Sequence, residues 1–422
     1  MFAAIIIIFF ICLAVGVPIA FSLGGFSILW SLFSGNEITL VARRMFYGVD
    51  SFTLLAVPLF MLSGSLMNNG NLSAKLVEFC RIFFGRVKGG LAYMNVLDSM
   101  IFAGMSGSSQ ADTASIGSIM IKQMEDEGYP SKVTLGVTCA SSTIGVIIPP
   151  SIPMLVLGSV ANVSIAGMFM GGILPGLIVG VMQMFQVLYM TKKYNFPKTK
   201  HLNFREGLQV AYKAIPSLMI PLIILGGTGA GIFTSTEAGV ICVFYALIVG
   251  VATRQLSMKV VWSSLKEVAL LSALPLLICS IGFPMGWILA FEGMPAIISA
   301  FITGFTTSPI IVLSIVALIV LFLGCFVDNI VIITIMVPIL LPVATAVGIN
   351  PIQFAIVVVV ASAIGLITPP VGQVLFVASS VAKKPLKTVI AGTAPFLIGE
   401  LIVLALLIII PQMSTLLPAL LL

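Results

Sequence analysis

The stretch Gly145-Val-Ile-Ile-Pro149-Pro150 has a counterpart in Gly365-Leu-Ile-Thr-Pro369-Pro370, 220 positions further along the chain (365 − 145). The same offset, without a gap, relates four further pairs: Gly104 and Gly324, Gly128 and Gly348, Gly172 and Gly392, Pro175 and Pro395. Gly and Pro impose backbone geometry, so their repetition indicates a repeated backbone and not a repeated chemistry. The sequence therefore predicts two structurally related halves.

Each Pro-Pro pair lies inside a strongly apolar segment, where it removes amide donors and interrupts a helix. At membrane depth, freed backbone groups are tolerated only where they are buried in protein or line a cavity. Broken helices at matching places in two halves are typical of the binding site of a transporter. The alternative interpretation is a pair of helix kinks without function, which the four further matched pairs disfavour.

The composition is that of a membrane protein. Of the 422 residues, 59% are hydrophobic and 8% are charged, and the mean hydropathy is +1.22. A soluble chain carries roughly three times this charged fraction. Apolar runs of about 18 residues or more recur, which predicts an all-α protein that crosses the membrane several times. The net charge of +6 comes from short loops that set orientation, so we expect no nucleic-acid partner.

The first half, residues 1–190, is predicted to contain a hairpin over 89–124 and a broken helix over 133–160. The apolar arms of the hairpin are about 15 residues each, too short to span the ~30 Å core of a bilayer. They flank a polar tip rich in Gly and Ser, Ala103 to Asp112. This pattern favours a re-entrant hairpin, which enters and leaves the membrane on one side.

The second half, residues 214–422, repeats this plan with a hairpin over 310–347 and a broken helix over 352–381. Between the halves, residues 191–213 carry six basic side chains and one acidic one, which predicts a cytoplasmic linker. About five crossings per half give the second half inverted topology, because an odd number reverses its direction. Residues 2–34 form either two crossings or one crossing with a kinked neighbour.

A cytoplasmic linker places most other basic segments on the same side of the membrane and puts both termini in the periplasm. Arg43 and Arg44 are the exception. Residues 71–88 alternate charged and apolar side chains, which predicts an amphipathic helix, lying either along the membrane surface or packed on the protein.

The two hairpin tips and two broken helices converge by symmetry near the middle of the bilayer. No Lys or Arg occurs between residues 269 and 382, so fixed positive charge is absent from the second half of this region. Unwound carbonyl groups suit a hard cation such as Na⁺, and the N-terminus of a half-helix suits an anion. Bound Na⁺ would supply the missing positive charge, which predicts sodium-coupled transport of an anion. The substrate-binding candidates are Ser108, Ser109, Asp328 and Asn329.

Asp328 is an acid beside a predicted tip with no basic residue nearby in sequence, and an intramembrane acid is a functional candidate by default. The alternative is an Asp that caps the N-terminus of a half-helix, and one residue can do both. Single Ser and Gly residues carry less weight, because small residues also allow close helix packing.

Seven segments together resemble the large membrane subunit (permease) of tripartite ATP-independent periplasmic (TRAP) transporters, along almost the whole chain. These segments are Val57-Pro-Leu-Phe-Met-Leu-Ser-Gly64, Phe102-Ala-Gly-Met-Ser-Gly-Ser-Ser109, Ala114-Ser-Ile-Gly117, Glu127-Gly-Tyr129, Ile148-Pro-Pro-Ser151, Ser235-Thr-Glu237 and Ile367-Thr-Pro-Pro-Val-Gly372. The resemblance implies an elevator-type carrier of the ion-transporter superfamily in the bacterial inner membrane. It also implies a small membrane subunit of four helices, here a separate protein, and a soluble periplasmic substrate-binding protein.

The same resemblance implies an organic-acid substrate, with sialic acid favoured and a C4-dicarboxylate next. It implies Na⁺ as the co-transported ion, held partly by backbone carbonyls. The implied sodium positions are Ser106, Gly145, Ile148 and Pro149 in the first half and Gly324, Gly365, Thr368 and Val371 in the second.

The nearest alternative is a stand-alone sodium/dicarboxylate symporter of the same fold that needs no partner. An intramembrane enzyme would be expected to carry acidic or His clusters at the membrane boundary. The acidic run Glu125 to Glu127 lies between Lys122 and Lys132 and is typical of a solvated loop. A passive channel does not account for two broken helices and two hairpins. We therefore expect a secondary transporter and not an enzyme.

Overall fold

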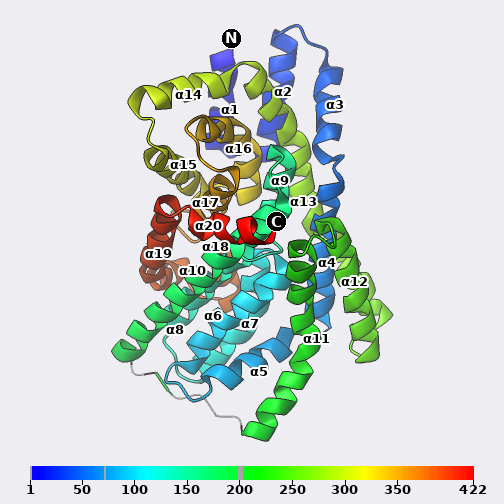
Figure 1. Ribbon diagram of the computed structural model, residues 1–422, viewed down its shortest axis with the longest axis vertical. Helices are drawn as coiled ribbons and strands as arrows, with labels where there is room; N and C mark the ends of the chain where they lie inside the picture. The colour runs from blue at the N-terminus through cyan, green and yellow to red at the C-terminus, as the bar shows by residue number, and fades with distance from the viewer. Residues whose placement is uncertain (1, 71–72, 195, 198–202) are drawn as a thin grey trace.

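The computed structural model describes residues 2–70, 73–194, 196–197 and 203–422, and this part of the chain is helical without a strand (Figure 1). The first half contains α1 (Phe2–Val15), α2 (Ile19–Phe33), α3 (Ile38–Val49), η1 (Phe52–Leu55), α4 (Ala56–Asn69), α5 (Ser73–Phe84), α6 (Gly90–Ser106), α7 (Ser109–Asp126), α8 (Ser131–Thr143), η2 (Ile144–Val146), α9 (Ile152–Ala161) and α10 (Ile165–Tyr194). The second contains α11 (Phe204–Gly229), α12 (Ser235–Ala252), α13 (Met258–Phe291), α14 (Met294–Phe305), α15 (Pro309–Gly324), α16 (Asn329–Ala346), α17 (Pro351–Gly365), α18 (Gln373–Ala382), α19 (Leu386–Ile409) and α20 (Gln412–Leu421).

Among the described residues, seven helical segments are long and apolar enough to cross a membrane. They are Phe52–Asn69, Ile165–Tyr194, Arg205–Gly229, Ser235–Ala252, Met258–Phe291, Asn329–Ala346 and Leu386–Ile409. Large apolar side chains on several of these helices, such as Phe244 and Leu270, are exposed, as expected for a surface that faces lipid. The expectation of an all-α membrane protein is confirmed.

The elements repeat as the sequence predicts. Moving α7 by 220 positions gives the bounds of α16, and α8 and α17 begin at Ser131 and Pro351. After the Pro-Pro turns the offset becomes 221, because α9 begins at Ile152 and α18 at Gln373. Both Pro-Pro peptide bonds are cis.

The gap-free matches of Gly172 with Gly392 and of Pro175 with Pro395 are therefore wrong by one residue, since α10 begins at Ile165 and α19 at Leu386. A Cβ atom on Gly392 would lie 3.1 Å from the amide nitrogen of Gly136, on α8. In the first half, Gly171 makes the equivalent approach to α17, the counterpart of α8. A Cβ atom on Gly171 would lie 3.4 Å from Cγ1 of Ile356. The extra residue lies in the turn before α18, where it does not disturb either helix.

Several elements differ from the sequence-based expectation. Helix α3 was not expected, because Arg43 and Arg44 interrupt its apolar pattern. In the structure, the guanidinium carbon of Arg44 lies 4.4 Å from the centre of the Trp287 ring. The helices of the first hairpin have 17 and 18 residues, not about 15. α16 is long enough for a crossing, and whether either hairpin is re-entrant stays a prediction.

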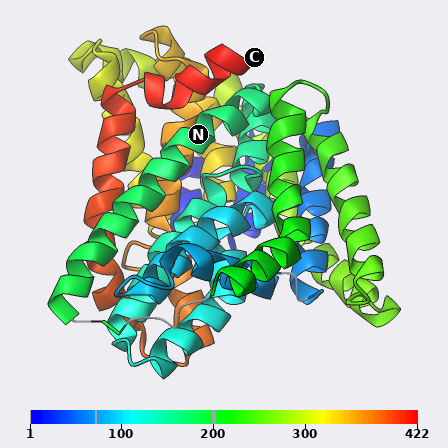
Figure 2. The ribbon, with the colours of Figure 1, turned by 60° about the horizontal axis from the view of Figure 1, so that its bottom comes forward.

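Helices also extend into both ends of the expected linker, residues 191–213. α10 continues to Tyr194 and α11 begins at Phe204, so helix covers both ends of 191–213, while 195 and 198–202 lie outside the described residues. Residues 2–34 form two helices, separated by Gly16 at φ +90°. The last described helix is α20, a segment for which the sequence predicted no element. Figure 2 shows α20 lying across one end of α19.

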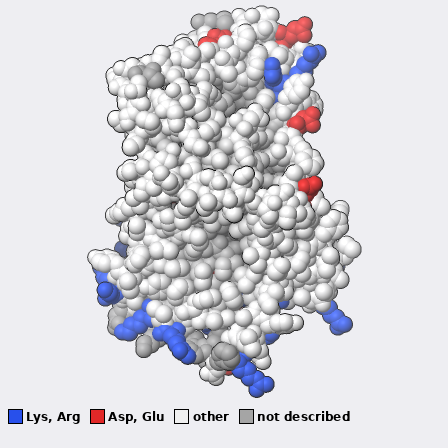
Figure 3. Space-filling model, viewed as in Figure 1, with Lys and Arg blue, Asp and Glu red and all other residues white. Residues whose placement is uncertain are grey.

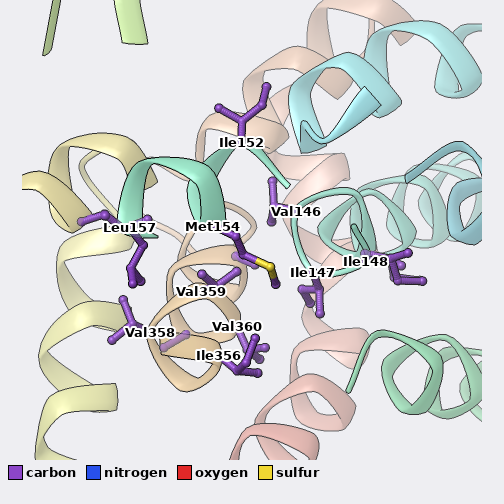
Figure 4. Packing of buried hydrophobic residues seen from close by; sticks show 14 of the residues in the cluster. Val146, Ile147, Ile148, Ile152, Met154, Leu157, Ile356, Val358, Val359 and Val360 are labelled. Carbon is purple, nitrogen blue, oxygen red and sulfur yellow. The ribbon is translucent and has the colours of Figure 1, made fainter. Parts of the chain in front are cut away.

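The broken helices form the core. All but the first two residues of α8 and all but the first two of α17 are buried, as expected for helices that are surrounded by other helices. Figure 4 shows Ile147 and Met154 of the first broken helix facing Ile356 and Val360 of α17. The two halves therefore share one core, and the first unwound turn lies within it.

Lys and Arg gather at one end of the molecule, near the end of α10 and the start of α11 (Figures 1 and 3). A smaller group, accompanied by acidic residues, lies towards the other end. The band between them is almost free of basic side chains on this face. This distribution suits a protein embedded in a bilayer; the cytoplasmic side of the linker and the periplasmic position of the termini stay predictions.

Candidate functional site

Both hairpin tips are built on helix caps at symmetry-related positions. Ser108 is the N-cap of α7, and its hydroxyl accepts a hydrogen bond from the Ala111 amide at 3.3 Å. Asp328 is the N-cap of α16, and its Oδ1 accepts from the Ile330 amide at 2.9 Å. Capping satisfies amides that the helix itself leaves free. The capping interpretation of Asp328 is confirmed, and it leaves Oδ2 available for other contacts.

One glutamine joins the two tips. Nε2 of Gln110, on α7, donates to Oδ2 of Asp328 at 3.2 Å and to Oε1 of Gln373 at 3.1 Å. The Ser108 hydroxyl donates to Oε1 of Gln110 at 3.2 Å. The tip of the first hairpin therefore contacts both the second hairpin and the start of α18, the helix after the second Pro-Pro turn. The predicted convergence of these elements is confirmed.

In the first half, the broken helix packs on the hairpin tip at Gly145. A Cβ atom there would lie 3.2 Å from the Ser108 carbonyl oxygen. The Ile152 amide donates to the Gly107 carbonyl at 3.3 Å, which fixes the other side of the turn. Within the described chain, the buried hydroxyls of Ser106 and Ser109 have no hydrogen-bond partner. Orphaned buried oxygens are unusual and are those that a bound ion or water would satisfy.

In the second half, Gly324 and Gly365 are in direct contact, since a Cβ on Gly324 would lie 3.0 Å from Cα of Gly365. The amides of Val371 and Gly372 both donate to the Cys325 carbonyl, at 3.2 and 3.0 Å. The Thr368 hydroxyl donates to the Ile364 carbonyl at 2.7 Å, which leaves its lone pairs free. The structure therefore brings the implied sodium positions of each half together around its own turn.

The two turns differ in exposure. Ile148, Pro149 and Pro150 are buried, whereas Pro369 and Pro370 are exposed and Thr368 and Val371 are half-buried. The symmetry of the elements thus does not extend to their surroundings. The first turn lies in the core of the protein and the second reaches its surface.

Two cavities flank the joined tips. One, of about 280 Å³, lies between the tips and α13, and it includes Ser108, Gln110, Asp328, Asn329 and Gln373. The other, of about 450 Å³, lies between the first hairpin and α4, with Ser106, Ser108 and Gln110 on one wall. Among the described residues that line either cavity there is no Lys or Arg. Ser109, in contrast, is fully buried behind the tip and does not line them.

Gln110 and Gln373 are not among the site residues predicted from the sequence. The sequence signals that could have indicated them are the position of Gln110 as one of few amides at a polar tip, and that of Gln373 at the start of a half-helix after a Pro-Pro turn. Glu400 was missed altogether. It is an acid in the middle of the apolar helix α19, and that position alone marks a functional candidate.

The amino-acid sequence is similar to those of known transport proteins. Residues 6–413 match the family profile described as "Tripartite ATP-independent periplasmic transporter, DctM component". The chain is 36% identical to the sialic acid TRAP transporter large permease protein SiaM of Vibrio cholerae, covering 96% of this chain and 95% of that one. It is 36% identical to the C4-dicarboxylate TRAP transporter large permease protein DctM of Pseudomonas aeruginosa, covering 92% and 91%.

The fold is similar to the crystal structure of the Alcanivorax borkumensis YdaH transporter, with a TM-score of 0.64 at 15% identity, covering 90% of this chain and 88% of that one. That structure was described as having an unusual topology.

Proposed function

Because the chain belongs to the family of the DctM component of tripartite ATP-independent periplasmic transporters, we propose that it takes up an organic acid by sodium-coupled elevator transport across the bacterial inner membrane. A relative that is 36% identical over nearly its full length supports the same family role. The observation that carries the proposal is the meeting of both hairpin tips at Gln110. The tips lie beside two mainly apolar cavities that contain several polar groups and no basic side chain among the described lining residues.

Sodium coupling is supported by the kind of atoms at the two turns. They offer hydroxyl oxygens and freed backbone carbonyls, which are ligands for a hard cation. Two of the hydroxyls, on Ser106 and Ser109, are buried without a partner in the described chain. An anionic substrate beside these turns gains from a bound cation, because its own burial without positive charge is costly. Na⁺ is here a co-transported substrate.

The substrate class is supported by the names of the relatives. They include transporters of sialic acid, a C4-dicarboxylate, 2,3-diketo-L-gulonate and isethionate, all of them organic anions. Sialic acid is favoured here because Asp328 presents an acceptor oxygen to the cavity region, which suits a polyhydroxylated acid. A bare dicarboxylate, the second candidate, would meet repulsion from the same carboxylate.

The proposed partners are a small membrane subunit of four helices and a soluble periplasmic substrate-binding protein. The competing proposal is a stand-alone sodium/dicarboxylate symporter of the same fold. The two differ in one requirement, the binding protein. We expect the chain, reconstituted with the small subunit, to transport only when the binding protein is present.

The test uses proteoliposomes containing both membrane subunits, with binding protein and labelled sialic acid outside. An inward Na⁺ gradient should drive uptake without ATP, since the sequence has no Gly-rich loop with the Lys that cradles phosphates. Equal uptake with and without the Na⁺ gradient would remove sodium coupling from the proposal. Uptake without the binding protein would favour the stand-alone symporter, and succinate in place of sialic acid tests the substrate order.

A further inference from the structure

Helix α5 packs against α11 at the end of the molecule where Lys and Arg gather (Figures 1 and 3). One side of α5 lies on the protein, because Leu76 and Cys80 are fully buried. Another side keeps large apolar side chains at the surface, such as Phe83, which is 58% exposed. A short helix that is packed on one side and carries exposed apolar and basic residues on the others is typical of the boundary between membrane and water.

Helix α11 crosses the same boundary. Its first part carries Arg205, Glu206 and Lys213, whereas residues 214–229 contain no charged side chain. Tyr212, beside Lys213, is 76% exposed, and exposed Tyr residues are enriched at the level of lipid headgroups. The beginning of the apolar part of α11 therefore marks the level at which headgroups meet acyl chains.

A groove of about 860 Å³ lies between the two helices at this level. Its walls are mainly apolar, with Phe79 from α5 and Tyr212, Ile215 and Leu218 from α11. Lys213 is the one charged residue among the described residues that line it. An apolar groove with a cationic group suits a ligand that is itself apolar along most of its length and anionic at one end.

A second ammonium group lies near that of Lys213. Burial lowers the pKa of Lys75, on α5, and the nearby charge of Lys213 lowers it further. Nζ of Lys75 donates to Oε1 of Gln255 at 3.2 Å, which is a neutral acceptor and compensates neither charge. An anion between two ammonium groups removes their mutual repulsion and is attracted by both.

The described chain does not supply that anion. Its one ion pair joins Lys384 to Glu125 and involves neither of these lysines. The acids on the two helices are Glu78, which is exposed, and Glu206, whose Oε2 accepts from the Asn203 amide at 2.9 Å in a capping box. Both ammonium groups therefore keep donors for an anion from outside the chain.

We propose that the groove between α5 and α11 binds an anionic phospholipid, with the phosphate held by Lys75 and Lys213 and an acyl chain along the apolar walls. Phosphate oxygens accept charge-assisted hydrogen bonds from ammonium groups, and basic pockets between helices at a membrane surface bind anionic headgroups. The apolar walls favour a lipid over a free phosphate. Binding of the lipid does not depend on the transported substrate or on the co-transported ion.

The test is native mass spectrometry of the purified full chain, alone and together with the small membrane subunit. The protein is titrated with phosphatidylglycerol or with phosphatidylcholine that has the same acyl chains. We expect phosphatidylglycerol to bind more tightly. In the double variant Lys75→Gln/Lys213→Gln its apparent affinity should fall at least about tenfold, while that of phosphatidylcholine should be unchanged, because each basic residue at a membrane surface adds to the attraction of anionic lipid.

Two further double variants are matched controls. Lys75→Arg/Lys213→Arg keeps both charges and should bind phosphatidylglycerol within about twofold of wild type. Lys192→Gln/Lys193→Gln removes the same charge from exposed positions at the end of α10, outside the groove, and should also bind as wild type does. Thermal stability in detergent, measured for all variants, shows that each is folded.

Equal affinity of wild type and Lys75→Gln/Lys213→Gln for phosphatidylglycerol would overturn the proposal. An equal loss in the α10 control would also contradict it, since binding would then follow the total charge at this end. Glycerophosphoglycerol, the headgroup without acyl chains, should not displace the lipid, and displacement at equal concentration would assign the groove to a free phosphate ester. Loss of the lipid on addition of the small subunit would assign the groove to that subunit. These measurements need no transport assay, so their failure is distinct from failure of the proposed transport function.

Discussion

At the residue level, the glycines of the two turns are needed because a side chain would clash with the neighbouring hairpin, and not because the backbone is left-handed. Neither Gly145 nor Gly365 is among the residues with positive φ. The Cβ contacts give the reason for glycine here, because both glycines lie against the tip of the hairpin in their own half.

Gly365→Val should abolish uptake while the protein level in the membrane is unchanged. A Cβ atom at this position would lie 2.5 Å from the Cα of Gly324, and overpacking of this kind costs about 1–3 kcal/mol. The hairpin must then move away from the turn. Uptake and membrane level are measured together, with Gly226→Val as control, because a Cβ at Gly226 meets no atom within 4 Å. Normal uptake by Gly365→Val would show that this contact is not needed for transport.

Asp328 should matter through its charge. Asp328→Asn keeps an oxygen that can cap α16, but it removes both the charge at the cavity and the oxygen that accepts from Gln110 Nε2. We expect uptake to fall at least about tenfold, roughly 1.4 kcal/mol, with the membrane level unchanged. Initial uptake rates of Asp328→Asn and Asp328→Ala are compared. If Asn is normal and Ala is inactive, capping and size account for the residue, and its charge does not.

At the scale of elements, the hairpins and broken helices depend on polar contacts between segments far apart in sequence. The link through Gln110 joins α7 to the N-termini of α16 and α18. Helix N-termini attract acceptors and anions, so these two termini and Asp328 define the polar side of the smaller cavity. The contact of both tips at one residue couples the two halves.

Gln110→Leu should lower uptake about fivefold without loss of protein. The change removes donors to Asp328 and Gln373, and a hydrogen bond of this kind contributes about 1 kcal/mol. Uptake rate and thermal stability in detergent are the measurements. Ser118→Ala, an exposed change later on the same helix, serves as control. A variant with lower stability but normal uptake would limit the role of Gln110 to folding.

At the scale of the whole molecule, an elevator mechanism requires that both tips move as one body against the remaining helices. The cavities lie between the tips on one side and α4 and α13 on the other, which is the boundary that such a movement would cross. The tip contacts through Gln110 would supply a connection within such a body.

Single cysteines at Ser108 and at Asn329 test this movement, because both residues line the smaller cavity. The transporter is trapped facing inward and then facing outward, and both cysteines are labelled from one side of the membrane. Labelling should be higher in one trapped state than in the other, and the difference should have the same sign at both positions. Labelling of an exposed position outside the cavities, such as Ser118 on α7, calibrates reagent access. Opposite changes at the two tips would contradict a single moving body.

The class of protein and its internal repeat could be predicted from the amino-acid sequence. Apolar runs set the helices because a bilayer admits no unpaired backbone, and matched Gly and Pro residues set the two turns because their backbone geometry is intrinsic. The helix caps Ser108 and Asp328 could also be predicted from the sequence, since a cap is a local contact.

Which side chains meet depends on how the helices pack, and this could not be predicted from the sequence. Gln110 and Gln373 are 263 residues apart, and Glu400 and Thr143 are 257 apart, so no local periodicity relates them. The one-residue shift after the Pro-Pro turns could not be predicted either, because the offset of 220 between Gly172 and Gly392 indicated a gap-free repeat. Packing selects among such registers by steric fit, and here it places Gly171 and Gly392 where helices touch.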